Sequence, residues 1–230
     1  YIPFNMAGIL IAIGIIYGDI GTSPLYVFNA IVGNKVIDAQ LVLGALSCVF
    51  WTLTLQTTLK YVLLTLTADN NGEGGMFSLY ALIKRRTKYM LLPAVIGGGA
   101  LLAEGIITPP ISVASAVEGL QARIPHLPTL EIVVVILSLL FIIQQFGTTT
   151  VGKWFAPVMV IWFGMIAVLG FAQIIHFSPV LKAVNPYYAF DLLRNYPHGF
   201  YLLGGVFLCT TGAEALYSDL GHVGRKNIRI

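Results

Sequence analysis

Charged residues are scarce in this sequence. Asp, Glu, Lys and Arg make up 10% of the 230 residues, whereas soluble globular domains carry about a quarter. Hydrophobic residues account for 57%, and the mean hydropathy is +0.84. The formal net charge of +3 is spread thinly along the chain, which argues against nucleic acid as a partner. The composition therefore excludes an ordinary soluble domain and indicates a protein of the lipid bilayer.

Cysteine is also nearly absent. The two cysteines, Cys48 and Cys209, both fall in apolar segments, and neither has a partner at the spacing of a metal site. The sequence therefore predicts neither a disulfide framework nor a zinc site, and we expect no cofactor. A signal peptide is not indicated, because the first apolar segment is too long and contains an acid.

Three short motifs are missing, and each absence argues against a class of protein. The glycine-rich segment 68–75 lacks the G-x-x-x-x-G-K-[ST] spacing of a nucleotide-binding loop. The T-V-G-Y-G filter of a potassium channel does not occur. An intramembrane aspartyl protease would require Gly-x-Gly-Asp, but Ile16 stands where the first glycine before Asp19 would be. We therefore expect a protein that is not an enzyme.

Long apolar runs are what the sequence does contain. Six runs reach or approach the ~20 residues needed to cross about 30 Å of hydrocarbon. We therefore predict an all-α membrane protein, because a helix satisfies its own backbone polar groups in lipid. The predicted spans are 6–30, 41–66, 91–118, 130–147, 154–177 and 199–219.

Basic residues between the spans predict the orientation. With the N-terminus inside, eight lie on the cytoplasmic side and four outside, which favours both termini in the cytoplasm. The inner group is Lys84, Arg85, Arg86, Lys88, Lys153, Arg225, Lys226 and Arg229, and the outer group is Lys35, Arg123, Lys182 and Arg194. Lys60 lies in the second span near its inner end, where it can extend toward the interface. The inner loop 67–90 ends in an amphipathic stretch, 76–88, which we expect to lie along the interface.

The stretch 17–26, within the first span, combines an acid with helix breakers. Asp19 is flanked by Gly18, Gly21 and Pro24. These residue types interrupt a helix and leave backbone groups free to bind a ligand. A carboxylate beside unwound backbone at mid-membrane depth is typical of ion sites in secondary transporters. We therefore predict that the first helix is broken at an ion site.

Two further acids, Glu104 and Glu214, fall inside predicted spans. Three acids that faced lipid would cost roughly 7–10 kcal/mol, so we expect all three to face the interior of the helix bundle. Each of these two has a hydroxyl neighbour on one helical face, Thr108 for Glu104 and Thr211 for Glu214. Pro109 and Pro110 should kink the third span, and Gly212 is a candidate break in the sixth.

Purely structural interpretations of these residues stay open. Asp19 could hydrogen-bond amides at the helix break, and Glu104 could join helices by bonding a Ser or Thr. Glu214 could be structural as well. The threonines could bond the carbonyl four residues back in their own helix. Trp51, Trp154 and Trp162 are expected to be packing or interfacial residues.

Five segments in chain order resemble the KUP (Kup/HAK/KT) family of potassium uptake permeases. They are G-D-I-G-T-S-P-L-Y at 18–26, A-D-N-N-G-E-G-G at 68–75, E-G-I-I-T-P-P-I at 104–111, V-G-K at 151–153 and T-G-A-E-A-L-Y-S-D at 211–219. They extend across the whole chain, which makes the resemblance specific. Some relatives carry a tyrosine beside the third-helix acid, but here Ala103 and Gly105 flank Glu104, so no tyrosine contact is expected there.

The resemblance implies the amino acid–polyamine–organocation superfamily and a LeuT-like fold of two inverted five-helix repeats. Residues 1–177 would form the first repeat, and 178–230 the outer loop and the first helix of the second. About six of twelve expected helices would be present, with helices 1 and 6 broken. The remaining helices and a cytoplasmic C-terminal domain, through which a homodimer could form, would lie outside this chain. The expected location is the cell membrane.

The implied function is potassium uptake, driven by proton symport. Family acids match Asp19, Glu104 and Glu214, and oxygen-bearing neighbours match Tyr26, Thr108 and Thr211. Potassium is a hard cation whose hydration shell is replaced by oxygens, which these residues, Thr22 and freed carbonyls around 18–23 would supply. We assign Asp19 to the ion, and Glu104 and Glu214 to ion or proton coupling. An amino-acid or other cation transporter on the same fold, or a non-transporting subunit, is the alternative.

Overall fold

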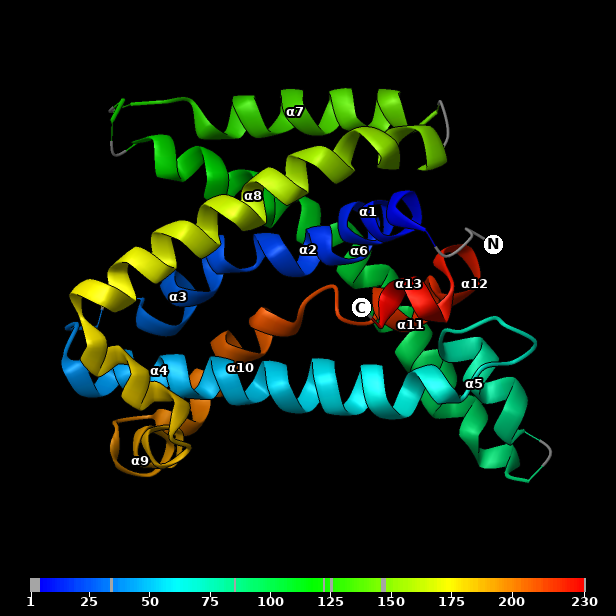
Figure 1. Ribbon diagram of the computed structural model, residues 1–230, viewed down its shortest axis with the longest axis horizontal. Helices are drawn as coiled ribbons and strands as arrows, with labels where there is room; N and C mark the ends of the chain where they lie inside the picture. Colours follow the sequence, from blue (N-terminus) through cyan, green and yellow to red (C-terminus); the bar gives the residue numbers. More distant parts are fainter. Residues whose placement is uncertain are drawn as a thin grey trace.

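The computed structural model describes residues 5–33, 35–84, 86–121, 123–124, 126–145 and 148–229. Within these ranges the chain forms helices joined by turns and loops, with one isolated bridge between Asn70 and Glu73 and no strand (Figure 1). The all-α prediction is confirmed. Arg85 and the end of predicted span 130–147 lie outside the described residues, as do the side chains of Lys88, of the 151–153 motif and of Trp154.

Three short helices, α1 (Met6–Ile15), α2 (Tyr17–Thr22) and α3 (Pro24–Val32), make up the first apolar segment. The others follow in chain order. They are α4 (Ala39–Thr52) with its π-helical continuation η1 (Leu53–Leu64) and the turn η2 (Thr65–Thr67), α5 (Met76–Ile83), η3 (Lys88–Met90), α6 (Leu91–Gln121), α7 (Thr129–Gln144), α8 (Thr148–His176), η4 (Ser178–Val184), α9 (Tyr187–Asn195), α10 (Gly199–Phe207), η5 (Leu208–Thr210), α11 (Ala215–Ser218), α12 (Leu220–Val223) and α13 (Arg225–Ile228).

Four helical segments are long and apolar enough to cross a membrane. By length and composition these are Ala39–Thr67, Leu91–Gln121, Phe155–His176 and Gly199–Ser218, which match four of the predicted spans. Helix α7 is apolar but only 16 residues long. The first predicted span, 6–30, is absent from this group because its helix is divided. The third continues as helix through Pro109 and Pro110, where the sequence predicted a kink.

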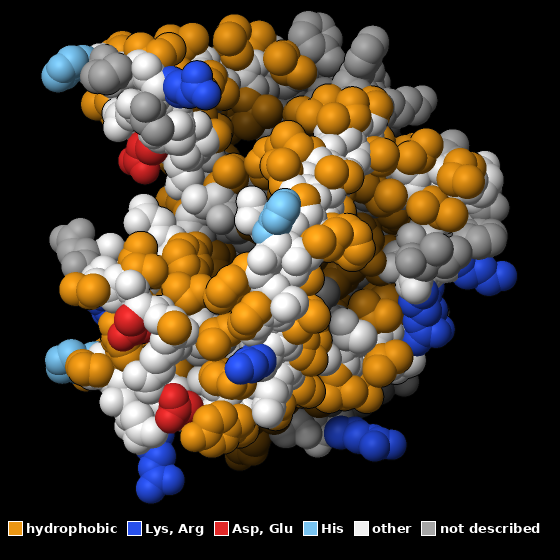
Figure 2. Space-filling view, turned by 60° about the vertical axis from the view of Figure 1, so that its left-hand side comes forward, with side chains coloured by type: hydrophobic (Ala, Val, Ile, Leu, Met, Phe, Trp, Pro, Cys, Tyr) orange, Lys and Arg blue, Asp and Glu red, His pale blue; other side chains and the backbone are white. Residues whose placement is uncertain are grey.

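The long helices carry exposed apolar faces. Leu102 and Ile106 of α6 are each 73% exposed, and Ile161 of α8 is 72% exposed. Hydrophobic side chains cover most of the face in Figure 2, with few charged side chains among them. A surface of this kind is suited to hydrocarbon rather than water.

Helices α1 and α2 pack closely on α8 along a face of glycines, and α8 runs alongside them in Figure 1. A Cβ at Gly14 would lie 2.7 Å from the backbone nitrogen of Ala156. One at Gly21 would lie 2.5 Å from Phe163 Cζ. Small residues three and four apart allow helix backbones to approach in this way. The glycines therefore fix how near α2, the helix that carries Asp19, lies to α8.

Two buried clusters hold the broken segments in place. One joins α3, α4, α9 and α10, with Ile31, Leu41, Leu192 and Val206 fully buried or nearly so. The other joins α1, η2 and the C-terminal helices α11 to α13. Each end of the molecule thus has its own apolar core. The first apolar segment (α1 to α3) and the sixth (α10, η5 and α11) run between these cores. Gly97 and Gly98 of α6 pack against α5, because a Cβ at Gly97 would meet Met76 and one at Gly98 would meet Phe77.

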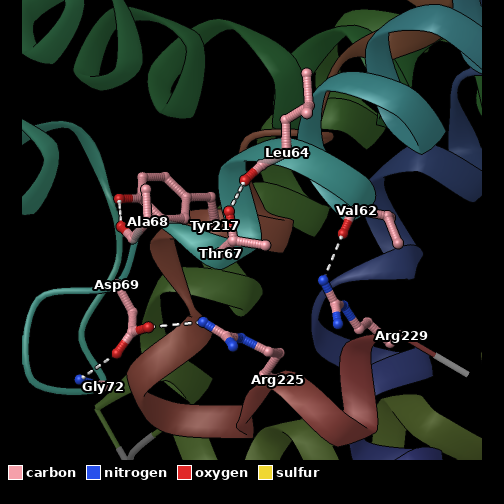
Figure 3. A network of polar contacts seen from close by, with 9 residues as sticks. All are labelled: Val62, Leu64, Thr67, Ala68, Asp69, Gly72, Tyr217, Arg225 and Arg229. Atoms are coloured by element: carbon pink, nitrogen blue, oxygen red, sulfur yellow. Dashed lines mark hydrogen bonds and ion pairs between the residues drawn. The ribbon is translucent and has the colours of Figure 1, made fainter.

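A polar network ties the loop after η2 to the C-terminal helices (Figure 3). Arg225 forms an ion pair with Asp69 at 2.6 Å, and Asp69 also accepts a hydrogen bond from the amide of Gly72. The Tyr217 hydroxyl donates to the carbonyl of Ala68 at 2.5 Å. Arg229 donates to the carbonyl of Val62. The contacts of Arg225 and Tyr217 fix the start of the glycine-rich loop 68–75 against α13 and α11.

We expect Gly14→Ala to destabilise the protein. The added methyl group would overlap the backbone of α8 at Ala156, and an overlap of this size costs about 1–3 kcal/mol. Thermal unfolding of the purified full-length protein in detergent measures the effect. Gly164→Ala is the matched control, since a Cβ at Gly164 of α8 meets nothing within 4 Å. Equal melting temperatures for the two variants would contradict the close packing of α1 on α8.

Candidate functional site

The first apolar segment is interrupted at Ile16 and Ser23, but less than the sequence predicted. Residues 17–22 form the short helix α2, and both junction residues keep helical backbone angles. The expectation of unwound backbone around 18–23 is therefore wrong. The Thr22 and Ser23 hydroxyls donate to the carbonyl of Asp19, at 2.9 and 3.4 Å. Such bonds to a carbonyl of the preceding turn often bend a helix, which agrees with the interruption at Ser23.

A tryptophan of α8 forms a hydrogen bond with the backbone of α2. The Trp162 indole nitrogen donates a 2.8 Å hydrogen bond to the carbonyl of Gly21. The sequence predicted only a packing or interfacial role for Trp162. The carbonyls of Asp19 and Gly21 thus already accept hydrogen bonds from the protein itself. The backbone of α2 consequently offers fewer free oxygens to a ligand than the sequence predicted.

The sixth apolar segment, in contrast, is unwound. Helix α10 ends at Phe207, a 3₁₀ turn follows, and Thr211 is extended with ψ of 130°. Gly212 then has φ of +84°, in the region that glycine adopts without steric cost. Helix resumes at Ala215. The break that the sequence predicted at Gly212 is present.

Gly212 lies directly against the carboxyl group of Asp19. A Cβ at this glycine would be 2.6 Å from Asp19 Cβ and 2.8 Å from both Cγ and Oδ2. Only a residue without a side chain fits at that distance. The two interrupted segments, almost 200 residues apart in sequence, therefore meet at the Asp19 carboxylate.

A cavity of about 630 Å³ opens beside this contact. All three acids predicted to face the interior line it, together with the hydroxyl-bearing Thr22 and Thr108. The complete lining is Gly14, Gly18, Asp19, Thr22, Leu101, Glu104, Gly105, Thr108, Pro109, Ser112, Val113, Leu140, Phe155, Met159, Glu214, Ala215 and Ser218. Carboxylates and hydroxyls on an otherwise apolar wall form a surface that can bind a small cation. We call this the Asp19 cavity.

A second cavity, of about 210 Å³, shares two acids with the first. Glu104 and Glu214 line both, so they form the wall between them. Thr211 lines only this second cavity. The remaining lining residues are Gln56, Lys60, Tyr61, Phe207 and Thr210. We call it the Lys60 cavity, after its one basic residue.

The predicted site residue Tyr26 lines neither cavity. It is 7% exposed and belongs to the apolar core of α3, α4, α9 and α10. Its hydroxyl lies 3.2 Å from Ser23 Oγ and beside Thr211. Tyr26 therefore links the interruption of the first segment, at Ser23, to that of the sixth, at Thr211, from outside the cavities.

Lys60 was expected to extend toward the interface; it is exposed, and it also lines the second cavity, which the sequence did not predict. Its ammonium lies 4.7 Å from the centre of the Tyr61 ring, and both residues come from the π-helix η1. Long π-helical stretches are rare and often mark functional sites. One signal was available, because Lys60 lies six residues inside the predicted span end at 66, about 9 Å by helical rise. At that depth an ammonium needs polar neighbours.

The acids share a cavity but do not converge on one point. Among the described residues, no group of three His, Cys, Asp or Glu side chains has the geometry to hold a metal ion. A cation bound here would meet one or two carboxylates at a time, with hydroxyls and water completing its shell. That arrangement suits an ion that binds and leaves rather than a resident metal.

Comparison with known proteins identifies relatives across the whole chain. The family model described as "K+ potassium transporter integral membrane domain" matches residues 6–230. The chain is 65% identical over 230 residues to a protein of Flavobacterium johnsoniae named "Probable potassium transport system protein Kup". Proteins with the same name from Cytophaga hutchinsonii and Clostridium perfringens (strain SM101) are 64% and 54% identical over 229 and 242 residues.

These matches cover 97–98% of the chain but only 35–36% of each relative. The chain thus spans about a third of the length of the curated relatives it matches. No solved structure gives a significant match.

We expect Gly212→Ala to lower the free energy of unfolding of the protein. A side chain at φ of +84° costs about 1–2 kcal/mol, and the methyl group would overlap the Asp19 carboxyl, for a total of about 2 kcal/mol or more. The melting temperature of the full-length protein in detergent should fall accordingly. Gly204→Ala in the same segment should be neutral, because a Cβ there meets nothing within 4 Å. A Gly212→Ala variant as stable as Gly204→Ala would refute the contact with Asp19.

Proposed function

The chain belongs to the K+ potassium transporter family, and on that premise we propose that it forms part of a potassium uptake system of the cell membrane, working by symport with protons. One observation carries the proposal. Asp19, Glu104 and Glu214 line a single cavity beside the meeting point of two interrupted membrane segments. The relatives are named as potassium transport proteins.

The proposed ion ligands come from the oxygens of this cavity. Asp19 supplies the ionised carboxylate, and the hydroxyls of Thr22 and Thr108 supply neutral oxygens. The Thr22 hydroxyl donates its hydrogen bond to the carbonyl of Asp19, so its oxygen lone pairs remain available to coordinate a cation. Thr211 is placed to contribute from the Lys60 cavity. Tyr26 acts by holding Ser23 and Thr211 rather than by touching the ion.

Proton coupling is assigned to the two acids that line both cavities. A carboxyl that lines a cavity within the membrane can take up or release a proton, and its charge alters the affinity for a nearby cation. Glu104 or Glu214 takes up the proton while Asp19 holds the potassium ion, and the site changes access only when both ions are bound. Uptake of one ion is thereby linked to uptake of the other.

The proposed architecture is the LeuT-like one, with residues 1–177 as the first repeat and 178–230 beginning the second. The arrangement supports this, since the first and sixth apolar segments are both interrupted and meet at the proposed site. Transporters with inverted repeats bind substrates at such interruptions. The N-terminus would be cytoplasmic, and a homodimer would form through a C-terminal domain outside this chain.

Asp19→Asn should abolish potassium uptake, because the amide keeps the shape of the carboxyl but removes the charge that binds the cation. Uptake of rubidium, a potassium substitute, into proteoliposomes of the full-length protein measures this. Glu118→Gln is the control, since Glu118 is exposed near the end of α6 and lines neither cavity. Rubidium accumulation at the normal rate by Asp19→Asn would rule out Asp19 as the ion ligand.

An inwardly directed proton gradient should accelerate rubidium uptake by the wild-type protein several-fold. A transmembrane potential clamped with an ionophore separates the chemical effect of protons from the electrical one. Uptake that is indifferent to the proton gradient would refute symport and leave a potassium pathway standing. No uptake under either condition would refute the proposed function itself.

A further inference from the structure

Lys60 is the one basic residue among the described residues that line the two cavities. It comes from η1, whose residues Gln56, Lys60 and Tyr61 all line the smaller cavity. On the opposite wall are Glu104 from α6 and Glu214, which precedes α11. An ammonium and two carboxylates thus share a space of about 210 Å³.

Lys60 is exposed, but it also lines a cavity with the two acids nearest the break in the sixth segment. Extension toward the membrane surface alone does not explain that shared lining. The ring of Tyr61 lies 4.7 Å from the ammonium and offers its electron-rich face to the charge.

The ammonium is near the acids without being bound to either. Within the described residues, the one ion pair between a basic side chain and a carboxylate at 4.0 Å or less is that of Arg225 with Asp69. Lys60 therefore acts on Glu104 and Glu214 through the field across the cavity, and their oxygens stay available to other ligands. Opposite charges that line one cavity attract each other, and the attraction grows where the cavity is shielded from water.

The formal charges give this lysine a role. Asp19, Glu104, Glu214 and Lys60 together carry a charge of −2 when all are ionised. One potassium ion and one proton neutralise that charge. Without the lysine the same walls would carry −3 and could hold a further cation.

We propose that Lys60 is a built-in counter-charge that limits the two cavities to one potassium ion and one proton and keeps the bound potassium weakly enough held to be released. It is a positioning residue and does not touch the transported ion. The proposal rests on the proposed function, since it concerns how the same acids bind potassium. The titratable groups that face Lys60 are Glu104, Glu214 and Tyr61, with Asp19 in the adjoining cavity.

The sign of the effect makes the proposal testable. Removing a positive charge beside a cation site strengthens cation binding, whereas removing a structural residue weakens binding or leaves it unchanged. Equilibrium binding of radioactive rubidium to the purified full-length protein in detergent should therefore become about tenfold tighter in Lys60→Met, or show a second bound ion. The maximal rate of uptake into proteoliposomes should fall as the KM falls, because the ion leaves more slowly.

Three further variants complete the experiment. Lys60→Arg keeps the charge and should bind rubidium as the wild type does. Lys60→Gln is a second neutral variant that preserves the sign test if Lys60→Met folds poorly. Lys182→Met removes an exposed lysine of η4, far along the chain from either cavity lining, and should leave binding and uptake unchanged.

The outcomes separate this proposal from the one on which it rests. Tighter rubidium binding in both neutral variants, with wild-type binding in Lys60→Arg, supports it. If both neutral variants bind rubidium as the wild type does, or more weakly, the proposal for Lys60 is overturned. The proposed potassium function still stands in that case, provided that the wild-type protein takes up rubidium. A wild-type protein that neither binds nor takes up rubidium would overturn the proposed function.

Discussion

The contact between Gly212 and the Asp19 carboxyl determines how the rest of the site is arranged. Gly212 reaches Asp19 because it has no side chain and adopts a positive φ, which turns the sixth segment sharply after Thr211. The turn directs Thr211 into the smaller cavity and Glu214 into the wall between both cavities. Asp19 is held from the other side by α8, through the close approach at Gly21 and the hydrogen bond from Trp162. The carboxylate is thus fixed between two elements that are distant in sequence.

The two interruptions differ in kind. In the first segment, residues 17–22 stay helical, and the hydroxyls of Thr22 and Ser23 bond back to the carbonyl of Asp19. In the sixth, a glycine with positive φ makes the turn without strain. The backbone is therefore more regular around Asp19 than around Gly212. This favours side-chain oxygens over backbone carbonyls as the proposed ligands on the Asp19 side.

Electrostatics explains why the polar residues gather where they do. A charged side chain facing hydrocarbon costs several kcal/mol, so acids within membrane segments collect around polar cavities. Here the two cavities share Glu104 and Glu214, which places a proton-binding group in contact with both spaces. The single ammonium of Lys60 reduces the net negative charge of these walls. The outer faces of α6 and α8, in contrast, present large exposed apolar side chains such as Leu102, Ile106 and Ile161.

Some of this could be determined from the sequence alone. The apolar runs and the scarcity of charge indicated a helical membrane protein, since hydrocarbon leaves a chain with few ways to satisfy its backbone. Asp19, Glu104 and Glu214 stood out because acids are costly at that depth, and the glycine at 212 indicated the second break. Tertiary structure alone decided three other features: the helical conformation of α2, the burial of Tyr26 outside both cavities, and the position of Lys60 opposite two acids. The physical reason is the distance along the chain over which each interaction acts. Apolar runs, charge and helix breakers act locally and can be read along the chain, whereas contacts such as Trp162 with Gly21 and Gly212 with Asp19 arise only when distant helices pack together.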